Sequence, residues 1–100
     1  GILPATLHRV AQTLADGAAI VAPRYQDQRG HPVGLSRRFH GELLALTGDA
    51  GARAIVAGNR DLITFIDVDD PGVIKDIDTP ADLANLASDH PAYRVFRHVA

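Results

Sequence analysis

The sequence predicts an α/β fold with an incomplete sheet and flanking helices. Two short apolar runs bounded by turn residues, AAIVAP at 18–23 and LITFIDV at 62–68, are typical of buried strands. Helical patterns precede the first run and separate it from the second, which is the element order of an α/β domain. Since a stable sheet usually has three or more strands, we expect further strands from elsewhere in the protein or from another chain.

Composition indicates one globular domain spanning residues 1–100. Hydrophobic residues make up 46% of the chain, charged residues 22%, and the net charge is -2. The arginines are scattered and form no basic stripe, so no nucleic-acid partner is predicted. The chain has no cysteine, which excludes disulfides and thiolate sites and fits a cytoplasmic location. No apolar run approaches the roughly 20 residues of a membrane span, so no membrane association is predicted.

The chain begins with Gly1 and contains no methionine. We therefore expect it to be processed or to be a piece of a longer protein.

The first third of the chain predicts a helix, a strand and a loop. Residues 4–15 place apolar side chains at helical spacing, with proline early and Gly17 at the end. The apolar run at 18–23 predicts a strand buried on both faces. The polar segment 24–34 predicts a loop that leads into a short strand at 33–35.

The middle of the chain predicts two helices and the second strand. Ser36 can cap a helix that runs to residue 46, and Asp49 can cap the next helix, at 50–57. The β-rich run at 62–68 predicts the second strand.

The end of the chain predicts a turn and two helices. Asp-Pro-Gly at 70–72 is turn chemistry, and an extended segment at 73–77 is expected to follow it. Thr79 caps a helix at 79–87, and a last short helix is expected from residue 90 onward.

Five aspartates lie close together in the sequence: Asp67, Asp69, Asp70, Asp76 and Asp78. The first three surround a Pro-Gly turn, so we expect them to shape the backbone. The last two alternate along an extended segment that ends at a helix N-terminus. They are the better candidates for holding a cation and phosphate, since carboxylate oxygens are the ligands that magnesium prefers.

A second candidate site is the segment Arg29, Gly30, His31 and Pro32, in a loop that follows a buried strand. Ligands in α/β sheets usually bind at such loops. Arg29 offers a planar fork of donors to phosphate, and His31 can donate a hydrogen bond or act as an acid or base near neutral pH. The alternative is that His31 is only solvated.

The glycines of GDAGAR at 48–53 could let backbone amides approach a phosphate. The segment has no lysine and lacks P-loop spacing, so an ordinary turn between helices is the favoured interpretation.

Three strings in a fixed order, GHPV, GDAGAR and DIDTPADL, make the chain resemble the C-terminal half of the MobA-like nucleotidyltransferase family, over about residues 4–87. The likeness is greatest to its molybdenum-cofactor cytidylyltransferase-like members. The resemblance implies a Rossmann-like fold and transfer of CMP or GMP from a nucleoside triphosphate to a phosphorylated acceptor such as molybdopterin, with release of pyrophosphate. It also implies Mg²⁺ near Asp76 and Asp78, and an acceptor-side loop at Arg29 to Pro32.

The chain departs from the family pattern at its start. It has neither the glycine-rich nucleotide loop nor the Asp-Met-Pro motif of the family, and GILPATL resembles the family segment directly after that motif. We therefore expect this chain alone to lack the nucleotide-binding half and to be inactive. The alternative hypothesis is a non-catalytic binding or oligomerisation module, including a homo-oligomer, that pairs an exposed sheet edge with another chain.

Overall fold

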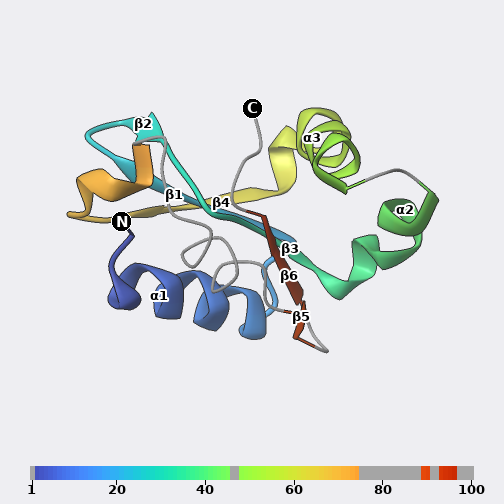
Figure 1. Ribbon diagram of the computed structural model, residues 1–100, viewed down its shortest axis with the longest axis horizontal. Helices are drawn as coiled ribbons and strands as arrows, with labels where there is room; N and C mark the ends of the chain where they lie inside the picture. The colour runs from blue at the N-terminus through green and yellow to red at the C-terminus, as the bar shows by residue number, and fades with distance from the viewer. Residues whose placement is uncertain (1, 46–47, 75–88, 91–92, 97–100) are drawn as a thin grey trace.

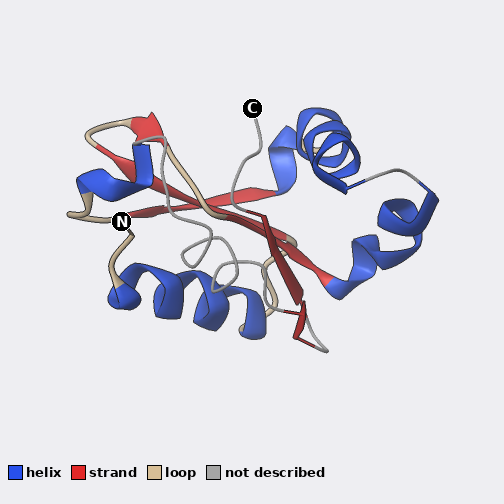
Figure 2. Cartoon of the chain, viewed as in Figure 1, coloured by secondary structure: helices blue, strands red, loops and turns tan. Residues whose placement is uncertain are grey.

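The computed structural model describes residues 2–45, 48–74, 89–90 and 93–96, and it has the α/β fold that the sequence predicts (Figure 1). Six strands form one mixed sheet within these residues (Figure 2). Their bounds are β1 Ile20–Tyr25, β2 Gln28–Arg29, β3 Val33–Ser36, β4 Ile63–Asp67, β5 Asp89–His90 and β6 Tyr93–Phe96. The α-helices are α1 Pro4–Ala15, α2 His40–Ala45 and α3 Gly48–Gly58, and the 3-10 turns are η1 Arg37–Phe39, η2 Arg60–Leu62 and η3 Pro71–Ile74.

Strand β1 lies at the centre of the sheet. It pairs in parallel with β4 along one edge and antiparallel with β2 and β3 along the other. Strand β6 then pairs with β3, and β5 pairs with β6. The sheet is therefore larger than the two strands that the sequence marks well, and the far edge of β3 is occupied by the chain's own residues.

Helix α1 covers one face of the sheet, as the lower part of Figure 1 shows. Its bounds are those that the sequence predicts, with proline at the first position, and the chain leaves it at Gly17 with φ +112°. Val10 and Leu14 pack against Val21 and Ile66 of the sheet. The 3.6-residue spacing of the apolar side chains thus produces the expected one-sided helix.

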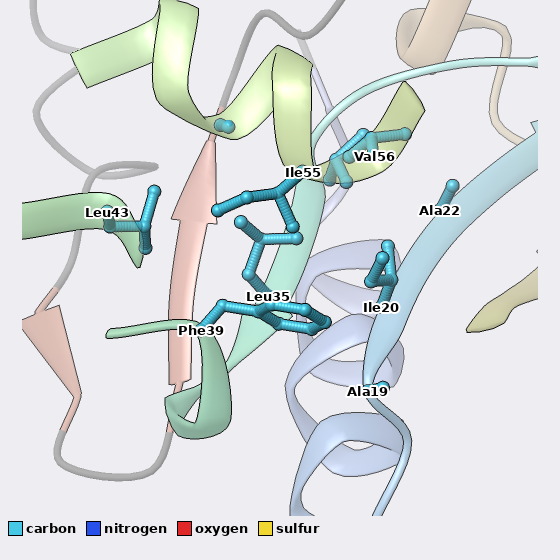
Figure 3. Close-up of a cluster of buried hydrophobic side chains, with 10 residues drawn as sticks. Ala19, Ile20, Ala22, Leu35, Phe39, Leu43, Ile55 and Val56 are labelled. Atoms are coloured by element: carbon cyan, nitrogen blue, oxygen red, sulfur yellow. The ribbon is translucent and has the colours of Figure 1, made fainter. Parts of the chain in front are cut away.

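Helices α2 and α3 cover the opposite face, over the larger core cluster (Figure 3). Leu35 and Phe39 meet Ile55 in the middle of this cluster. The other members are Ala19, Ile20, Ala22, Val33, Leu43, Ala52 and Val56. Strand β1 is buried on both faces because a helix layer lies on each side, which confirms the prediction from its continuous apolar run.

Several predicted boundaries in the middle of the chain are wrong. The cap at Ser36 is confirmed, since its hydroxyl accepts a hydrogen bond of 3.4 Å from the Arg38 amide, but the segment after it begins with the 3-10 turn η1 and becomes the α-helix α2 only at residue 40. Leu44 is an apolar residue of α2, yet it is 73% exposed. Helix α3 begins at residue 48, so Asp49 lies in its first turn and is not its cap.

The prediction of an extended segment at 73–77 is wrong for residues 73–74, because these residues belong to η3. The predicted helix at 79–87 lies outside the described residues. The predicted helix from residue 90 is also wrong, since residues 93–96 form strand β6. Tyr, Val and Phe favour strands. The edge of β3 also offers backbone hydrogen-bond partners, with which this segment pairs antiparallel.

None of the helices in the described parts of the chain is both long and apolar enough to cross a membrane.

Candidate functional site

A tight hairpin turns the chain after β1 and sets the position of Arg29. Gln26 and Asp27 form the two-residue turn, with φ of +49° and +66°, and Tyr25 pairs with Gln28. Two residues in the left-handed region are the signature of turns that match the twist of a hairpin. The turn places Arg29 directly beside Arg24 on β1.

The next three residues are fixed by backbone contacts. The Gly30 amide donates a hydrogen bond of 2.8 Å to the Pro23 carbonyl, and the His31 amide donates one of 2.6 Å to the Val73 carbonyl. The peptide bond between His31 and Pro32 is cis. Gly30 and Pro32 are buried, whereas Arg29 and His31 are half-buried. Within this loop, Arg29 and His31 are therefore the residues that reach the surface.

Only glycine fits at position 30. A Cβ atom there would lie 2.3 Å from the Val73 carbonyl oxygen and 2.7 Å from the Val73 Cβ, distances that real Cβ contacts essentially never show. Glycine thus allows η3 to press directly against the loop.

Asp70 anchors η3 to the start of α1. Its carboxylate is 3% exposed and accepts hydrogen bonds of 2.8 Å from the Leu3 amide, 2.8 Å from the Thr6 hydroxyl and 3.0 Å from the Gly72 amide. A buried carboxylate is stable only with such partners. The prediction that Asp70 shapes the turn is therefore confirmed, and its reach extends to α1, which the sequence did not reveal.

Together these contacts build a structured region where β1 and β4 end. Strands β1 and β4 are parallel, so their carboxyl ends lie at the same edge, at the left in Figure 1, beside β2 and η3. Ligands in open α/β sheets bind at this edge. The fold thus places the predicted loop, Arg29 to Pro32, where the general rule for α/β proteins expects a ligand.

An exposed ion pair lies at the same end of the sheet. Arg24 Nε donates to Asp67 Oδ1 at 2.8 Å, and Arg24 Nη2 donates to Oδ2 at 3.3 Å. The hydrogen bond from Arg24 lowers the pKa of Asp67, and the same bond raises the pKa of Arg24. Asp67 therefore serves a structural pairing, in agreement with its expected role.

The described residues offer no magnesium site. No group of three or more His, Cys, Asp or Glu side chains that could hold a metal occurs among them. Asp70 is occupied by three donors and Asp67 by Arg24. Asp76 and Asp78, the predicted metal ligands, lie outside the described residues.

GDAGAR at 48–53 is part of α3, so neither a phosphate loop nor the favoured interpretation, a turn between helices, is found at these residues. Sequence reasoning also missed Thr6, Arg60 and Phe65. Thr6 is a polar residue of α1 that is only 3% exposed. Its burial is explained by its hydrogen bond to Asp70, which lies far away in the sequence. Phe65 is an aromatic residue in a strand that the apolar pattern alone assigned to the core, yet it is 40% exposed.

Comparison with known proteins agrees with the fold. The model of the MobA-like NTP transferase domain family matches residues 1–63, which include the segment from Arg29 to Pro32. No curated protein and no solved structure matches the chain. The match covers more than half of the chain and runs through the β1–β3 region and α3. The chain therefore belongs to the MobA-like NTP transferase family.

Proposed function

We propose that the chain is the C-terminal, acceptor-side half of a nucleotidyltransferase that moves CMP or GMP from a nucleoside triphosphate to a phosphorylated acceptor such as molybdopterin. The observation that carries the proposal is the coincidence of two features. The family match includes the segment from Arg29 to Pro32, and this segment is held by backbone hydrogen bonds at the carboxyl ends of the parallel strands.

In this proposal each residue of the loop has a stated role. Arg29 donates paired hydrogen bonds to the acceptor phosphate, because the planar guanidinium fork matches phosphate oxygens. His31 donates a further hydrogen bond to the acceptor phosphate. Gly30 and Pro32 are buried and give the loop its shape, since the contact of Gly30 with Val73 leaves no room for a side chain.

The reaction is an in-line transfer. An oxygen of the acceptor phosphate forms a bond to the α-phosphorus of the nucleotide while the bond to the departing pyrophosphate breaks. Such reactions depend on positioning and on neutralising charge, rather than on covalent participation by the protein. Mg²⁺, with Asp76 and Asp78 as its ligands, belongs to this proposal through the family resemblance. When bound it would neutralise phosphate charge.

The test is magnesium-dependent release of pyrophosphate from CTP or GTP with a phosphorylated acceptor. We expect the 100-residue chain alone to be inactive and a longer protein that contains it to be active. Release that depends on both the acceptor and Mg²⁺ supports the proposal. A longer protein that binds neither nucleotide nor acceptor contradicts it.

Substitutions can distinguish the aspartates proposed as metal ligands from those with a structural role. We expect Asp78→Ala in the active, longer protein to lower turnover with little loss of stability, because a ligand residue contributes more to function than to packing. Asp69→Ala, on the exposed part of the preceding turn, is the matched control. Unfolding of the Asp78 variant, with normal activity in the fraction that stays folded, contradicts the role.

A non-catalytic module is the second candidate, and the edge of the sheet favours it. Among the described residues β4 pairs only with β1, so its outer edge presents unpaired backbone groups. Such an edge can add a strand from a second copy or from another protein. Sedimentation that shows a stable oligomer without nucleotide binding would favour this candidate over the enzyme.

A further inference from the structure

An open hollow lies on the face of the sheet that α3 covers. Its volume is about 480 Å³, which falls within the range of small-molecule sites. Its lining comes from β2, the end of α3, η2 and β4. The residues are Arg29, Val56, Ala57, Arg60, Ile63 and Phe65.

The hollow exists because α3 covers only the first part of β4. Side chains alternate along a strand, so Ile63 and Phe65 share a face of the sheet, and Ile63 packs against the core beneath α3. Phe65 stands beyond that cover and is 40% exposed, next to Ala22 of β1 in the register. An aromatic ring exposed at this edge provides an apolar floor that none of the described helices covers fully.

The charge around this floor is positive. Arg29 and Arg60 line the hollow, and no acidic residue is among the described residues of its lining. The guanidinium of Arg24 lies 5.0 Å from the centre of the Phe65 ring, a cation–π distance, while its hydrogen bonds to Asp67 hold it in place.

We infer that this hollow binds an organic anion with a compact apolar or planar body. Its charged group lies within reach of Arg29 and Arg60, because arginine forks match the oxygen atoms of phosphate and carboxylate. Its body rests on Phe65 against Val56 and Ile63. The hollow shares Arg29 with the proposed acceptor loop, but the inference concerns binding alone. It does not require nucleotidyl transfer, so it can hold whether or not that proposal does.

The probe is phenyl phosphate, with inorganic phosphate and phenol as its two halves. Titration of the full 100-residue chain, followed by amide chemical shifts in NMR, reports both affinity and position. We expect saturable binding with shifts at residues 56–65, and at least about fivefold weaker binding of inorganic phosphate, because the ring contact is then lost.

Two variants and one control assign the contacts. Arg60→Gln and Phe65→Leu should each weaken phenyl phosphate binding by about fivefold or more, whereas only Arg60→Gln should weaken the binding of phosphate. Arg37→Gln removes an equal charge from an exposed residue outside the hollow and should leave binding unchanged. The side chains of Arg60 and Phe65 are accessible to solvent, so we expect both variants to fold. Unchanged chemical shifts in the rest of the spectrum verify this.

Three results overturn the inference. They are the absence of saturable binding, equal affinity for phosphate and phenyl phosphate, and an effect of Arg37→Gln as large as that of Arg60→Gln. The last two would show that the chain attracts anions by its charge alone.

Discussion

Replacing Asp70 by asparagine removes the charge from the carboxylate that joins η3 to α1. Three donors converge on this side chain, from the Leu3 amide, the Thr6 hydroxyl and the Gly72 amide. An asparagine amide keeps one oxygen, so its NH₂ group must face at least one of these donors. One hydrogen bond is then lost, and the others lose the strengthening that a charged acceptor gives.

The size of the effect follows from these contacts. A hydrogen bond to a charged group contributes about 1.5 to 3 kcal/mol, and Thr6 and Asp70 are both 3% exposed, so water cannot replace the lost partner. We expect Asp70→Asn to lower the free energy of unfolding by about 2 to 3 kcal/mol. This is a large share of the roughly 5 to 15 kcal/mol that holds a domain together.

The assay is urea unfolding of a double-mutant cycle with Thr6→Val. We expect the two changes to be coupled by about 1 kcal/mol, because Asp70→Asn weakens or removes the same hydrogen bond that Thr6→Val deletes. Asp69→Asn, an exposed neighbour, should change stability by less than about 0.5 kcal/mol. Strict additivity within the cycle, or an effect of Asp69→Asn equal to that of Asp70→Asn, would refute the reasoning.

Three further predictions concern the same end of the molecule. Gly30→Ala should destabilise the chain by about 2 kcal/mol or more in urea unfolding, because its Cβ meets the backbone of Val73. Asp27→Gly should stabilise the hairpin by up to about 1 kcal/mol, measured by the thermal midpoint, because glycine relieves the left-handed φ of +66°. The lowered pKa of Asp67 means that its pairing with Arg24 contributes stability above the unfolded pKa and loses it as the pH falls through the folded value. Wild type should therefore lose more stability than Asp67→Asn on acidification below about pH 4, and parallel unfolding curves would contradict this.

The sequence predicted those elements whose signals are local. Helix α1 and strands β1 and β4 carry clear periodicity or continuous apolar runs, and they formed close to the predicted residues. Segment 93–96 was predicted as a helix because the sequence does not show the open edge of β3 with which it pairs. Elements that depend on a distant partner could not be assigned from local patterns.

The candidate site could likewise be predicted only where its signals are local in the sequence. The turn chemistry around Asp70 was visible in the Asp-Pro-Gly string, but its bonds to Leu3 and Thr6 join residues more than sixty positions apart in the chain. The hairpin at Gln26 and Asp27 carried no Asn-Gly signal, so the sequence indicated a loop there. Arg60 and Phe65 come together with Arg29 only through the folding of α3 and β4 onto the sheet.

The most direct test of the proposed function is the steady-state kinetics of Arg29→Gln in the active, longer protein. If Arg29 holds the acceptor phosphate, the KM for the acceptor should rise by about tenfold or more, the equivalent of one lost charge-assisted contact. The KM for the nucleotide should stay constant, and Arg37→Gln should change neither. A rise confined to the KM of the nucleotide, or no change in either constant, would contradict an acceptor-side role for the loop.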